Sequence, residues 1–534
     1  MIHLQLQQSP QASRNFRIAV LTAILVVGLA LRLWDLGRYA FWLDEAMEYW
    51  VASVGLKDLL PTVITALQDP PLYSAFLHFW MLLGQNESTL RLPSVVFSML
   101  AMLAIIRIAY RVDGWMAALI AGGSAAIAPI NLRYAQEVGQ YALITALICW
   151  NIVALQEIAI NGRRRYYLLW LVTALLGIYT YYGSIIIVTV SLACYLAEKI
   201  LTHDWRNWQS DLLISCAYLA AFLPLVIYFL PQQLFRGNTR LAFKLTLAPL
   251  LTELLSGLRA TQEVLAFYWA GWPWSPLPAW LPAALVAVTL GFALGFCVTR
   301  VQRRLLAWLF INWATYFLLG KLNLFPYTYR YSIILIPLLF PAIAMGLAAT
   351  LRRKYLMVAS LAIIGALFTI AIISLPNYAW RAFFFPDNRW DWPEGRPAYR
   401  TLISEWENQR QERDLTLVYY RITPTFAYYW GKLGGPVANL SPSWFVTCWN
   451  RSRPGGECIQ DHVILQNSLR DMDGERKKQA ILASIPPRTK TLWLLMMYIH
   501  DQDEAIYLDA LGNDFQIVSE KRINQDILIK FVRK

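Results

Sequence analysis

Long apolar runs separated by short polar turns occupy the first 375 residues of the chain. Most of these runs approach the length of about 20 residues that an α-helix needs to cross a bilayer. The first run is too long for the apolar h-region of a signal peptide and no A-x-A cleavage site follows it, so we expect it to be retained as a span. The pattern predicts a polytopic α-helical membrane protein with about eleven spans, near residues 17–34, 93–110, 115–130, 141–160, 166–183, 184–200, 211–231, 276–299, 305–320, 331–350 and 355–375.

Basic residues in the turns orient these spans. If the N-terminus is cytoplasmic and the spans alternate, every cytoplasmic turn carries arginine or lysine, as the positive-inside rule requires. A further apolar run at 70–83 is short for a crossing, and counting it would move every later basic turn outside. We therefore expect it to be an interfacial or re-entrant helix on the outer side. The prediction is a multi-pass plasma (inner) membrane protein in which everything after residue 375 is extracytoplasmic.

The residues after 375 differ in character, because they are richer in charge and contain short alternating segments. The expected elements are strands near 414–420, 489–498 and 515–533, the last as a hairpin, and helices near 396–410 and 501–511. We therefore expect two domains, a transmembrane domain over 1–375 and an extracytoplasmic α/β domain over 376–534. The second domain is long enough to hold its own core.

Composition agrees with a membrane protein and limits the other classes. Hydrophobic residues make up 57% of the chain and charged residues 15%, whereas soluble domains are about a quarter charged. A formal net charge of +13 would suit a nucleic-acid partner, but membrane topology explains the basic turns, so we expect none. Of the six cysteines, Cys448 and Cys458 lie in the C-terminal region, where an oxidising compartment favours a disulfide between them.

Two adjacent carboxylates follow the first span almost at once, in the segment FWLDEAMEYW at residues 41–50. Asp44 and Glu45 stand there among aromatic residues, which favour the membrane–water interface. Acids are also common at the start of a helix, so an amphipathic interfacial helix is the alternative explanation for the pair.

Basic residues also occur on the side expected to be outside, against the general trend. These are Arg91, Arg133, Lys321 and Arg330, and Arg133 shares the segment LRYAQEVGQY with Gln136 and Glu137. Next to a bilayer, the phosphate of a lipid is an anion that such side chains can bind. Carboxylates on the same face supply a candidate general base, so the combination favours group transfer from a lipid phosphate. For the LRYAQEVGQY segment, polar loop residues without a binding role are the alternative.

Five segments, in this order, resemble the GT-C polyprenyl-phosphate-dependent glycosyltransferases of the protein O-mannosyltransferase and lipid A aminoarabinose transferase kind. The segments are LRLWDLGRYAFWLDEA, DPPLYSAFLHFWMLLG, STLRLPSVVFSML, RYAQEVGQYAL and YRYSIILIPLL, which span most of residues 31–340. In such enzymes the acid of the first outer loop is taken as the catalytic base, and the resemblance places this role on Asp44, with Glu45 beside it. An Arg–Tyr pair at the outer end of a late span resembles Arg330–Tyr331, which implies a place near the donor phosphate.

The chain departs from this family at two positions. Many members have a histidine where this chain has Asp69, and many have an arginine where it has Gly139. The resemblance therefore implies that the preference for donor or acceptor differs from that of the best-known members.

The resemblance also implies a reaction, in which a sugar moves from a polyprenyl-phosphate donor to an acceptor hydroxyl with inversion at the anomeric carbon. The acceptor would be a lipid, a glycan or a protein. Because phosphate is a good leaving group, no metal cofactor is required; a divalent ion bridging the acid and the phosphate is the alternative. The residues expected to contact the donor phosphate are Arg330, Lys321, Arg91 and Arg133, and those expected to bind substrate are Asp69, Tyr134, Gln136, Glu137, Tyr141 and Tyr331.

A multi-span lipid or polysaccharide transporter or flippase with an extracytoplasmic domain is the alternative function. That function predicts ionisable residues in the middle of the spans and an inverted repeat. The sequence shows neither feature, because its candidate acids and bases gather at one face.

Overall fold

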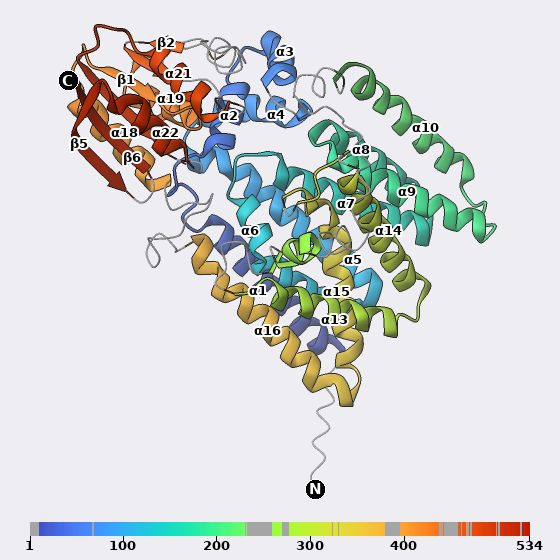
Figure 1. Cartoon of the computed structure of the whole chain (residues 1–534). Coiled ribbons are helices and arrows are strands. Elements are labelled where there is room, and N and C mark those ends of the chain that lie inside the picture. The colour runs from blue at the N-terminus through green and yellow to red at the C-terminus, as the bar shows by residue number, and fades with distance from the viewer. Residues whose placement is uncertain are drawn as a thin grey trace, which may run out of the picture. The chain divides into compact units, whose positions relative to one another are not determined.

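The computed structural model contains two compact units (Figure 1). The helical unit comprises Met1–Trp34 and Arg91–Ala379, and the sheet unit comprises Asp35–Leu90 and Trp380–Lys534. These units divide the chain differently from the expected single boundary near residue 375, because the segment after the first span clusters with the C-terminal region. The structure describes residues 10–66, 69–229, 231, 259–266, 268–269, 277–322, 324–328, 330–379, 396–436, 442, 458–460, 462–465, 469, 472–497, 499, 502–523 and 526–534.

Each of the eleven apolar runs lies largely within a helix of the helical unit. The helices are α1 (Pro10–Leu33), α5 (Glu87–Ile127, whose first turn belongs to the sheet unit), α6 (Pro129–Ala135), α7 (Gln140–Asn161), α8 (Arg164–Thr180), α9 (Gly183–Leu201), α10 (Trp208–Pro224), η2 (Leu225–Phe229), α13 (Trp280–Phe296), α14 (Arg300–Lys321), η3 (Tyr331–Leu335), α15 (Ile336–Leu351) and α16 (Lys354–Ala379). Within the described ranges, seven helices are long and apolar enough to cross a membrane, as judged by length and composition.

The long helix α5 contains two of the predicted spans and is interrupted between them. Asp113 and Gly114 leave helical geometry there, and Gly114 has a φ of 72°, which glycine adopts without a steric penalty. The Asp113 carboxylate accepts hydrogen bonds of 2.9 Å from both terminal nitrogens of Arg352, which lies in the turn between α15 and α16. Gln302 of α14 donates to the same carboxylate at 3.1 Å. The interruption in α5 therefore contacts the C-terminal end of α15 and the N-terminal end of α14.

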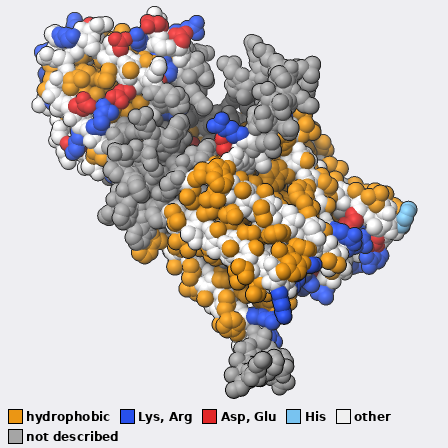
Figure 2. Space-filling model, turned by 60° about the horizontal axis from the view of Figure 1, so that its bottom comes forward, with side chains coloured by type: hydrophobic (Ala, Val, Ile, Leu, Met, Phe, Trp, Pro, Cys, Tyr) orange, Lys and Arg blue, Asp and Glu red, His pale blue; other side chains and the backbone are white. Residues whose placement is uncertain are grey.

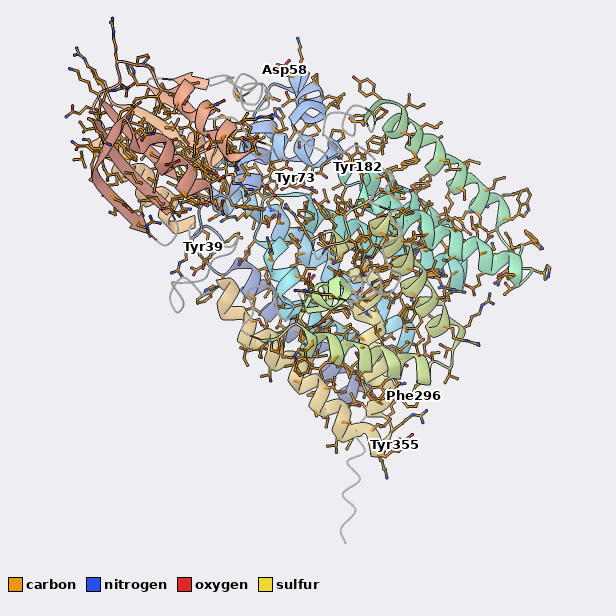
Figure 3. The ribbon with its side chains drawn as sticks, viewed as in Figure 1. Tyr39, Asp58, Tyr73, Tyr182, Phe296 and Tyr355 are labelled. Atoms are coloured by element: carbon orange, nitrogen blue, oxygen red, sulfur yellow. The ribbon has the colours of Figure 1, made fainter. Side chains whose placement is uncertain are left out.

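Burial separates the core of the helical unit from its periphery. In the apolar window of η3 and α15, 94% of the residues are buried, whereas in that of α16 only 22% are. A helix that is apolar all round is expected either in a core or against lipid, and these two helices illustrate the two cases. The apolar side chains left exposed form the broad hydrophobic surface seen in Figure 2. At the basic turn after α15, Arg353 lies 4.1 Å from the ring centroid of Phe296 and donates to Tyr355 at 3.1 Å (both rings are labelled in Figure 3).

The sheet unit combines the segment after the first span with the C-terminal α/β region. Its elements are α2 (Leu43–Ala52), α3 (Leu56–Ala66), α4 (Leu72–Trp80), η1 (Met81–Leu83), α18 (Arg396–Gln409), β1 (Leu415–Val418), α19 (Thr423–Lys432), β2 (Cys458–Gln460), β3 (Val463–Leu465), α21 (Gly474–Ser484), β4 (Thr491–Met496), α22 (Asp503–Gly512), β5 (Phe515–Ile523) and β6 (Asp526–Arg533). The short apolar run at 70–83 forms α4 and η1, as the prediction of a separate short helix requires.

The six strands form one mixed sheet in the order β2-β3-β1-β4-β6-β5. The central strand β1 is parallel to both β3 and β4, and all of its residues are buried, as is typical of strands covered on both faces. The edge strand β5 is mostly exposed and carries charged side chains, which discourage pairing with another chain.

The strands and helices predicted in the C-terminal region are present, including the antiparallel hairpin of β5 and β6. Helices α19 and α21 and strands β2 and β3 were not predicted. Helix α19 is rich in aromatic residues, which favour strands, but eight of its residues are buried and tertiary packing overrides this preference. Cys448 lies outside the described residues, so the disulfide between Cys448 and Cys458 stays a prediction, while the four cysteines of the helical unit are free.

Side chains of α18 and α19 hold the segment that leads into α2. Arg400 donates to the backbone oxygens of Gly37, Arg38 and Tyr39 at 3.1–3.2 Å and to Glu87 at 2.7 Å. The Tyr429 hydroxyl accepts from the Phe41 amide and donates to Glu87, each at 2.8 Å. The start of α2 is thus fixed by contacts with residues more than 300 positions away in sequence.

We expect Arg400→Ala to loosen this segment. The substitution removes several hydrogen bonds and leaves the largely buried Glu87 carboxylate without its cation, which costs about 1–3 kcal/mol. Hydrogen exchange of the Gly37–Phe41 amides in the purified protein should accelerate. Arg413→Ala, at an exposed position in the same unit, is the control and should leave the exchange unchanged. Equal exchange in both variants would contradict the assignment.

Candidate active site

Helix α2 presents the two predicted acids in different ways. Glu45 is completely buried, and its carboxylate accepts a hydrogen bond from the backbone N–H of Trp42 at 3.3 Å. This contact satisfies one of the amide donors that the start of a helix leaves open. Asp44 is partly exposed and lies about 100° away around the helix, so the two carboxylates face different surroundings.

A third acid of α2, Glu48, was not predicted. It lies one helical turn after Asp44, so both side chains share a face of α2. Glu48 is buried and accepts a hydrogen bond from the Ser74 hydroxyl of α4 at 3.3 Å. Burial and the nearby Asp69 carboxylate raise the pKa of Glu48 to about 8; the Ser74 hydroxyl opposes this shift and Asp44 adds to it. The spacing of four residues from Asp44 was the sequence signal that could have revealed it.

The carboxylates of Asp44 and Asp69 both lie close enough to Glu48 to raise its pKa by charge repulsion, so the three acids belong to one acidic group. Within the described ranges, no group of three or more histidine, cysteine, aspartate or glutamate side chains is arranged to hold a metal ion.

We expect the Glu48→Gln variant to gain stability relative to the natural protein as pH rises. The pKa of Glu48 lies at about 8 in the fold and at its ordinary value of 4.5 in the unfolded chain, so between these values the folded state holds a proton that the unfolded state has released. The stability of the natural protein therefore falls with rising pH by up to about 1.4 kcal/mol per unit from this group. Glutamine does not titrate. The difference in unfolding temperature between variant and natural protein should grow from about pH 5 to about pH 8, and a constant difference would contradict the prediction.

In the helical unit, Arg330 lies over an aromatic ring. Its guanidinium carbon is 5.0 Å from the ring centroid of Tyr141, which lies in the first turn of α7. Around Tyr141 lies an aromatic cluster that consists of Tyr134, Tyr141, Tyr181, Phe325 and Tyr331, with neighbouring ring centroids 4.7–6.3 Å apart. The structure therefore brings Arg330 together with three tyrosines that the sequence assigned to substrate.

Two members of the aromatic cluster were not predicted, Tyr181 and Phe325. Tyr181 ends α8 and stacks against Tyr331 with an interplanar angle of 8°. Its position at the end of an apolar run, on the side predicted to be outside, was the available signal. Phe325 came from the same segment as Lys321 and Arg330 but carries no polar group, so nothing in the sequence singled it out.

The segment around α6 supplies a second cation. Arg133 and Glu137 are both buried, with 3.8 Å between Nε and Oε2, and the Arg133 guanidinium lies 5.6 Å from the ring centroid of Tyr134. Gln136 donates to the backbone oxygens of Leu31, Arg32 and Trp34 at the end of α1. The Gln136 side chain therefore caps the end of α1, because it donates to backbone carbonyls that have no partner within the helix.

The two remaining predicted cations differ in exposure. Arg91 is almost completely buried in α5, whereas Lys321 is exposed at the end of α14, with its ammonium 5.8 Å from the ring centroid of Phe317. The predicted site residues thus form two sets. Asp44, Glu45 and Asp69 belong to the sheet unit, and the predicted cations and aromatic residues belong to the helical unit.

One family model and several solved structures are similar to this chain. A family model described as dolichyl-phosphate-mannose-protein mannosyltransferase matches residues 68–235. The solved structure of ArnT from Cupriavidus metallidurans bound to undecaprenyl phosphate aligns over 98% of this chain and 98% of that chain, with 13% identity and a TM-score of 0.50. Archaeal oligosaccharyltransferase AglB from Archaeoglobus fulgidus, in complex with an inhibitory peptide and a dolichol-phosphate, aligns over 95% of this chain and 73% of that chain, with 12% identity and a TM-score of 0.52. No curated protein matches the chain.

These comparisons establish the fold. The chain has the GT-C membrane fold followed by a region with a small sheet, and the resemblance to GT-C glycosyltransferases that the sequence predicted is confirmed. The apolar helices and this fold make it a multi-pass membrane protein.

Proposed function

We propose that the chain is a glycosyltransferase that moves a sugar from a polyprenyl-phosphate donor to an acceptor hydroxyl on the outer face of the membrane. The observation that carries the proposal is the alignment over almost the whole of both chains with a structure bound to undecaprenyl phosphate. The family model, which describes a mannosyltransferase that uses a lipid phosphate, supports the same class of donor. The acceptor class is a lipid, a glycan or a protein.

In the proposed step the acceptor oxygen forms a bond to the anomeric carbon while the bond from that carbon to the phosphate oxygen breaks. The phosphate leaves with the electron pair, and a single displacement of this kind inverts the anomeric centre. Asp44, the more exposed of the two adjacent acids, takes the proton of the acceptor hydroxyl as a general base. Glu45 is already engaged with the start of α2, which favours Asp44 for this role.

Arg330 is the proposed principal ligand of the donor phosphate, with Lys321, Arg91 and Arg133 as further cations. A guanidinium can donate two parallel hydrogen bonds to a phosphate, and the Arg330 guanidinium lies over the Tyr141 ring. Asp69, Tyr134, Gln136, Glu137, Tyr141 and Tyr331 are the proposed substrate-binding residues. Among them, the tyrosines of the aromatic cluster offer flat surfaces suited to a sugar or a prenyl chain.

The basic turns support an outer location for the site and for the C-terminal region, because they place the opposite ends of the helices in the cytoplasm. An alkaline-phosphatase fusion after residue 375 is expected to be active. An inactive phosphatase together with an active cytoplasmic reporter at the same position would overturn this orientation.

Mass spectrometry of cell-envelope lipids tests the function. Cells without the gene should accumulate a polyprenyl-phosphate sugar and lose one glycosylated product, and the natural gene should restore both. A strain that carries the Asp44→Asn gene should resemble the deletion. If the purified protein moves a lipid-linked sugar across the membrane of vesicles but transfers no sugar to an acceptor, the protein is a transporter instead.

A further inference from the structure

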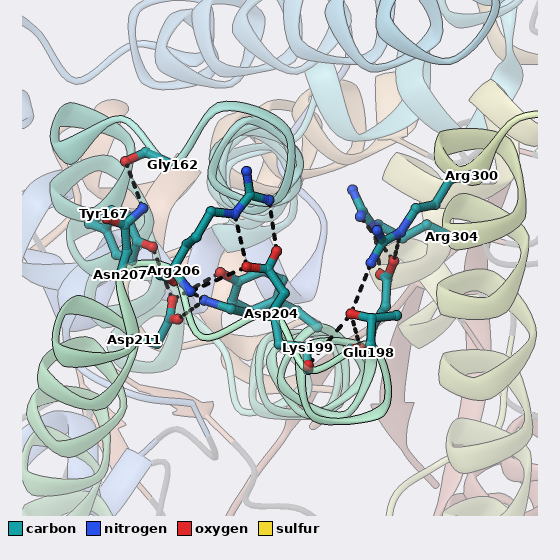
Figure 4. A network of polar contacts seen from close by, with 12 residues as sticks. Gly162, Tyr167, Glu198, Lys199, Asp204, Arg206, Asn207, Asp211, Arg300 and Arg304 are labelled. Atoms are coloured by element: carbon teal, nitrogen blue, oxygen red, sulfur yellow. Dashed lines mark hydrogen bonds and ion pairs between the residues drawn. The ribbon is translucent and has the colours of Figure 1, made fainter.

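A cavity of about 310 Å³ lies in the helical unit, at the end that carries the basic turns. Figure 4 shows the polar contacts among the residues that line it. It is bordered by the last turns of α7 and α9, the loop between α9 and α10, and the first turns of α8 and α14. Its volume is at the lower end of the range of about 300–1,000 Å³ found for ligand pockets. It shares no lining residue with the predicted acids or with the aromatic cluster.

Two arginines share one carboxylate on one side of this cavity. Arg300 donates from Nε to Glu198 at 2.6 Å, and Arg304 donates from Nε and Nη2 to the same side chain at 2.6 and 3.0 Å. A single carboxylate offsets only one of these two positive charges. Arg304 is only 8% exposed, and no acceptor among the described residues takes a hydrogen bond from its buried Nη1. A buried donor of a charged group that lacks an acceptor is costly, so the arrangement favours a second anion.

The remaining charges of the cavity are arranged in pairs. Arg206 donates two hydrogen bonds to Asp204, at 2.8 and 2.7 Å, and Lys199 pairs with Asp211. The Asp211 carboxylate also accepts from the hydroxyls of two tyrosines, one on α8 and one on α9. The carboxylates of Glu198, Asp204 and Asp211 are therefore all paired with cations. The four lining cations and the three carboxylates that pair with them leave one positive charge; the set is Lys199, Arg206, Arg300 and Arg304 with Glu198, Asp204 and Asp211, the last of which does not itself line the cavity.

We propose that this cavity binds the phosphate of an anionic phospholipid. Phosphate oxygens accept strong, charge-assisted hydrogen bonds from a guanidinium, and the surplus charge lies at Arg300 and Arg304. Large exposed apolar side chains stand next to the basic residues in sequence, namely Leu201, Trp205 and Val298. Such residues favour the boundary between membrane and water, where a lipid brings a phosphate together with acyl chains. Inorganic phosphate has no apolar part that could contact these side chains, so a lipid is the favoured source of the phosphate.

Native mass spectrometry of the purified full-length protein tests the proposal, with phosphatidylglycerol, phosphatidylcholine or inorganic phosphate added separately at constant ionic strength. The natural protein is expected to retain phosphatidylglycerol in preference to phosphatidylcholine. Arg304→Gln should weaken this retention by roughly tenfold, as expected for the loss of charge-assisted hydrogen bonds. Arg300→Gln, at a more exposed position, serves as a second variant if Arg304→Gln does not fold.

Arg107→Gln is the matched control. Arg107 is also a cation at this end of the helical unit, but it pairs with Glu157 and does not line the cavity, so its loss should leave lipid retention unchanged. Equal retention of both lipids by the natural protein, or equal loss in Arg107→Gln and Arg304→Gln, would overturn the proposal. Binding of inorganic phosphate without any preference for lipid would overturn the lipid as its source. None of these outcomes depends on the proposed sugar transfer.

Discussion

Asp44→Asn is expected to lower sugar transfer by about 10²–10⁴-fold, which corresponds to about 3–5 kcal/mol of barrier. Asparagine keeps the size and shape of the side chain but cannot accept the proton of the acceptor hydroxyl. Asp44 is partly exposed, so the substitution should leave the fold intact. Initial rates of transfer from a polyprenyl-phosphate sugar by the purified variant, with its unfolding temperature measured in parallel, give the comparison.

Glu45→Gln is the matched control because the altered residue is the immediate neighbour. Glutamine can still accept a hydrogen bond from the Trp42 amide, so both the cap of α2 and measurable activity should survive. If Glu45→Gln is inactive while Asp44→Asn is active, the roles of the two acids are exchanged and the reaction class stands. Full activity of both variants at normal expression would mean that the acids only belong to an interfacial helix, and the proposed mechanism would be wrong.

Arg330→Lys is expected to weaken donor use by roughly 10–100-fold, even though the positive charge is kept. The substitution removes one of two parallel hydrogen bonds to the phosphate, and a hydrogen bond to a charged group contributes about 1.5–3 kcal/mol. It also replaces a planar group, whose central carbon lies 5.0 Å from the Tyr141 ring centroid, by a compact and strongly hydrated ammonium. The apparent affinity for the donor should change more than the rate at saturating donor.

Lys321→Arg provides the comparison for Arg330→Lys, since it is the opposite exchange at an exposed cation of the same segment. Its effect on donor affinity should be small, because Lys321 is proposed only as a helper. An unchanged apparent affinity for the donor in Arg330→Lys would show that Arg330 has a structural role at the end of its helix and does not bind the phosphate.

The sequence by itself determined the membrane class and most elements of the chain. Apolar runs such as 141–160 and 331–350 form helices because apolar length is a local property that needs no partner to be recognised. The strands β1, β4, β5 and β6 were readable for a similar reason, since their apolar and β-branched residues favour a half-buried pleated surface. The ordered motifs also sufficed to indicate the GT-C fold, which the comparisons confirm.

Only the tertiary structure decided which distant groups meet. The segment of α2 joins the sheet unit because Arg400 and Tyr429 hold its start, and no local pattern encodes contacts across more than 300 residues. The spacing from Asp44 could have pointed to Glu48, but its raised pKa comes from burial and from Asp69 on another segment, which no local pattern encodes. The contact of the Arg330 guanidinium with the Tyr141 ring likewise joins two remote segments. Periodicity and composition report the local preferences of the backbone, whereas burial and the pairing of charges arise only when remote segments pack together.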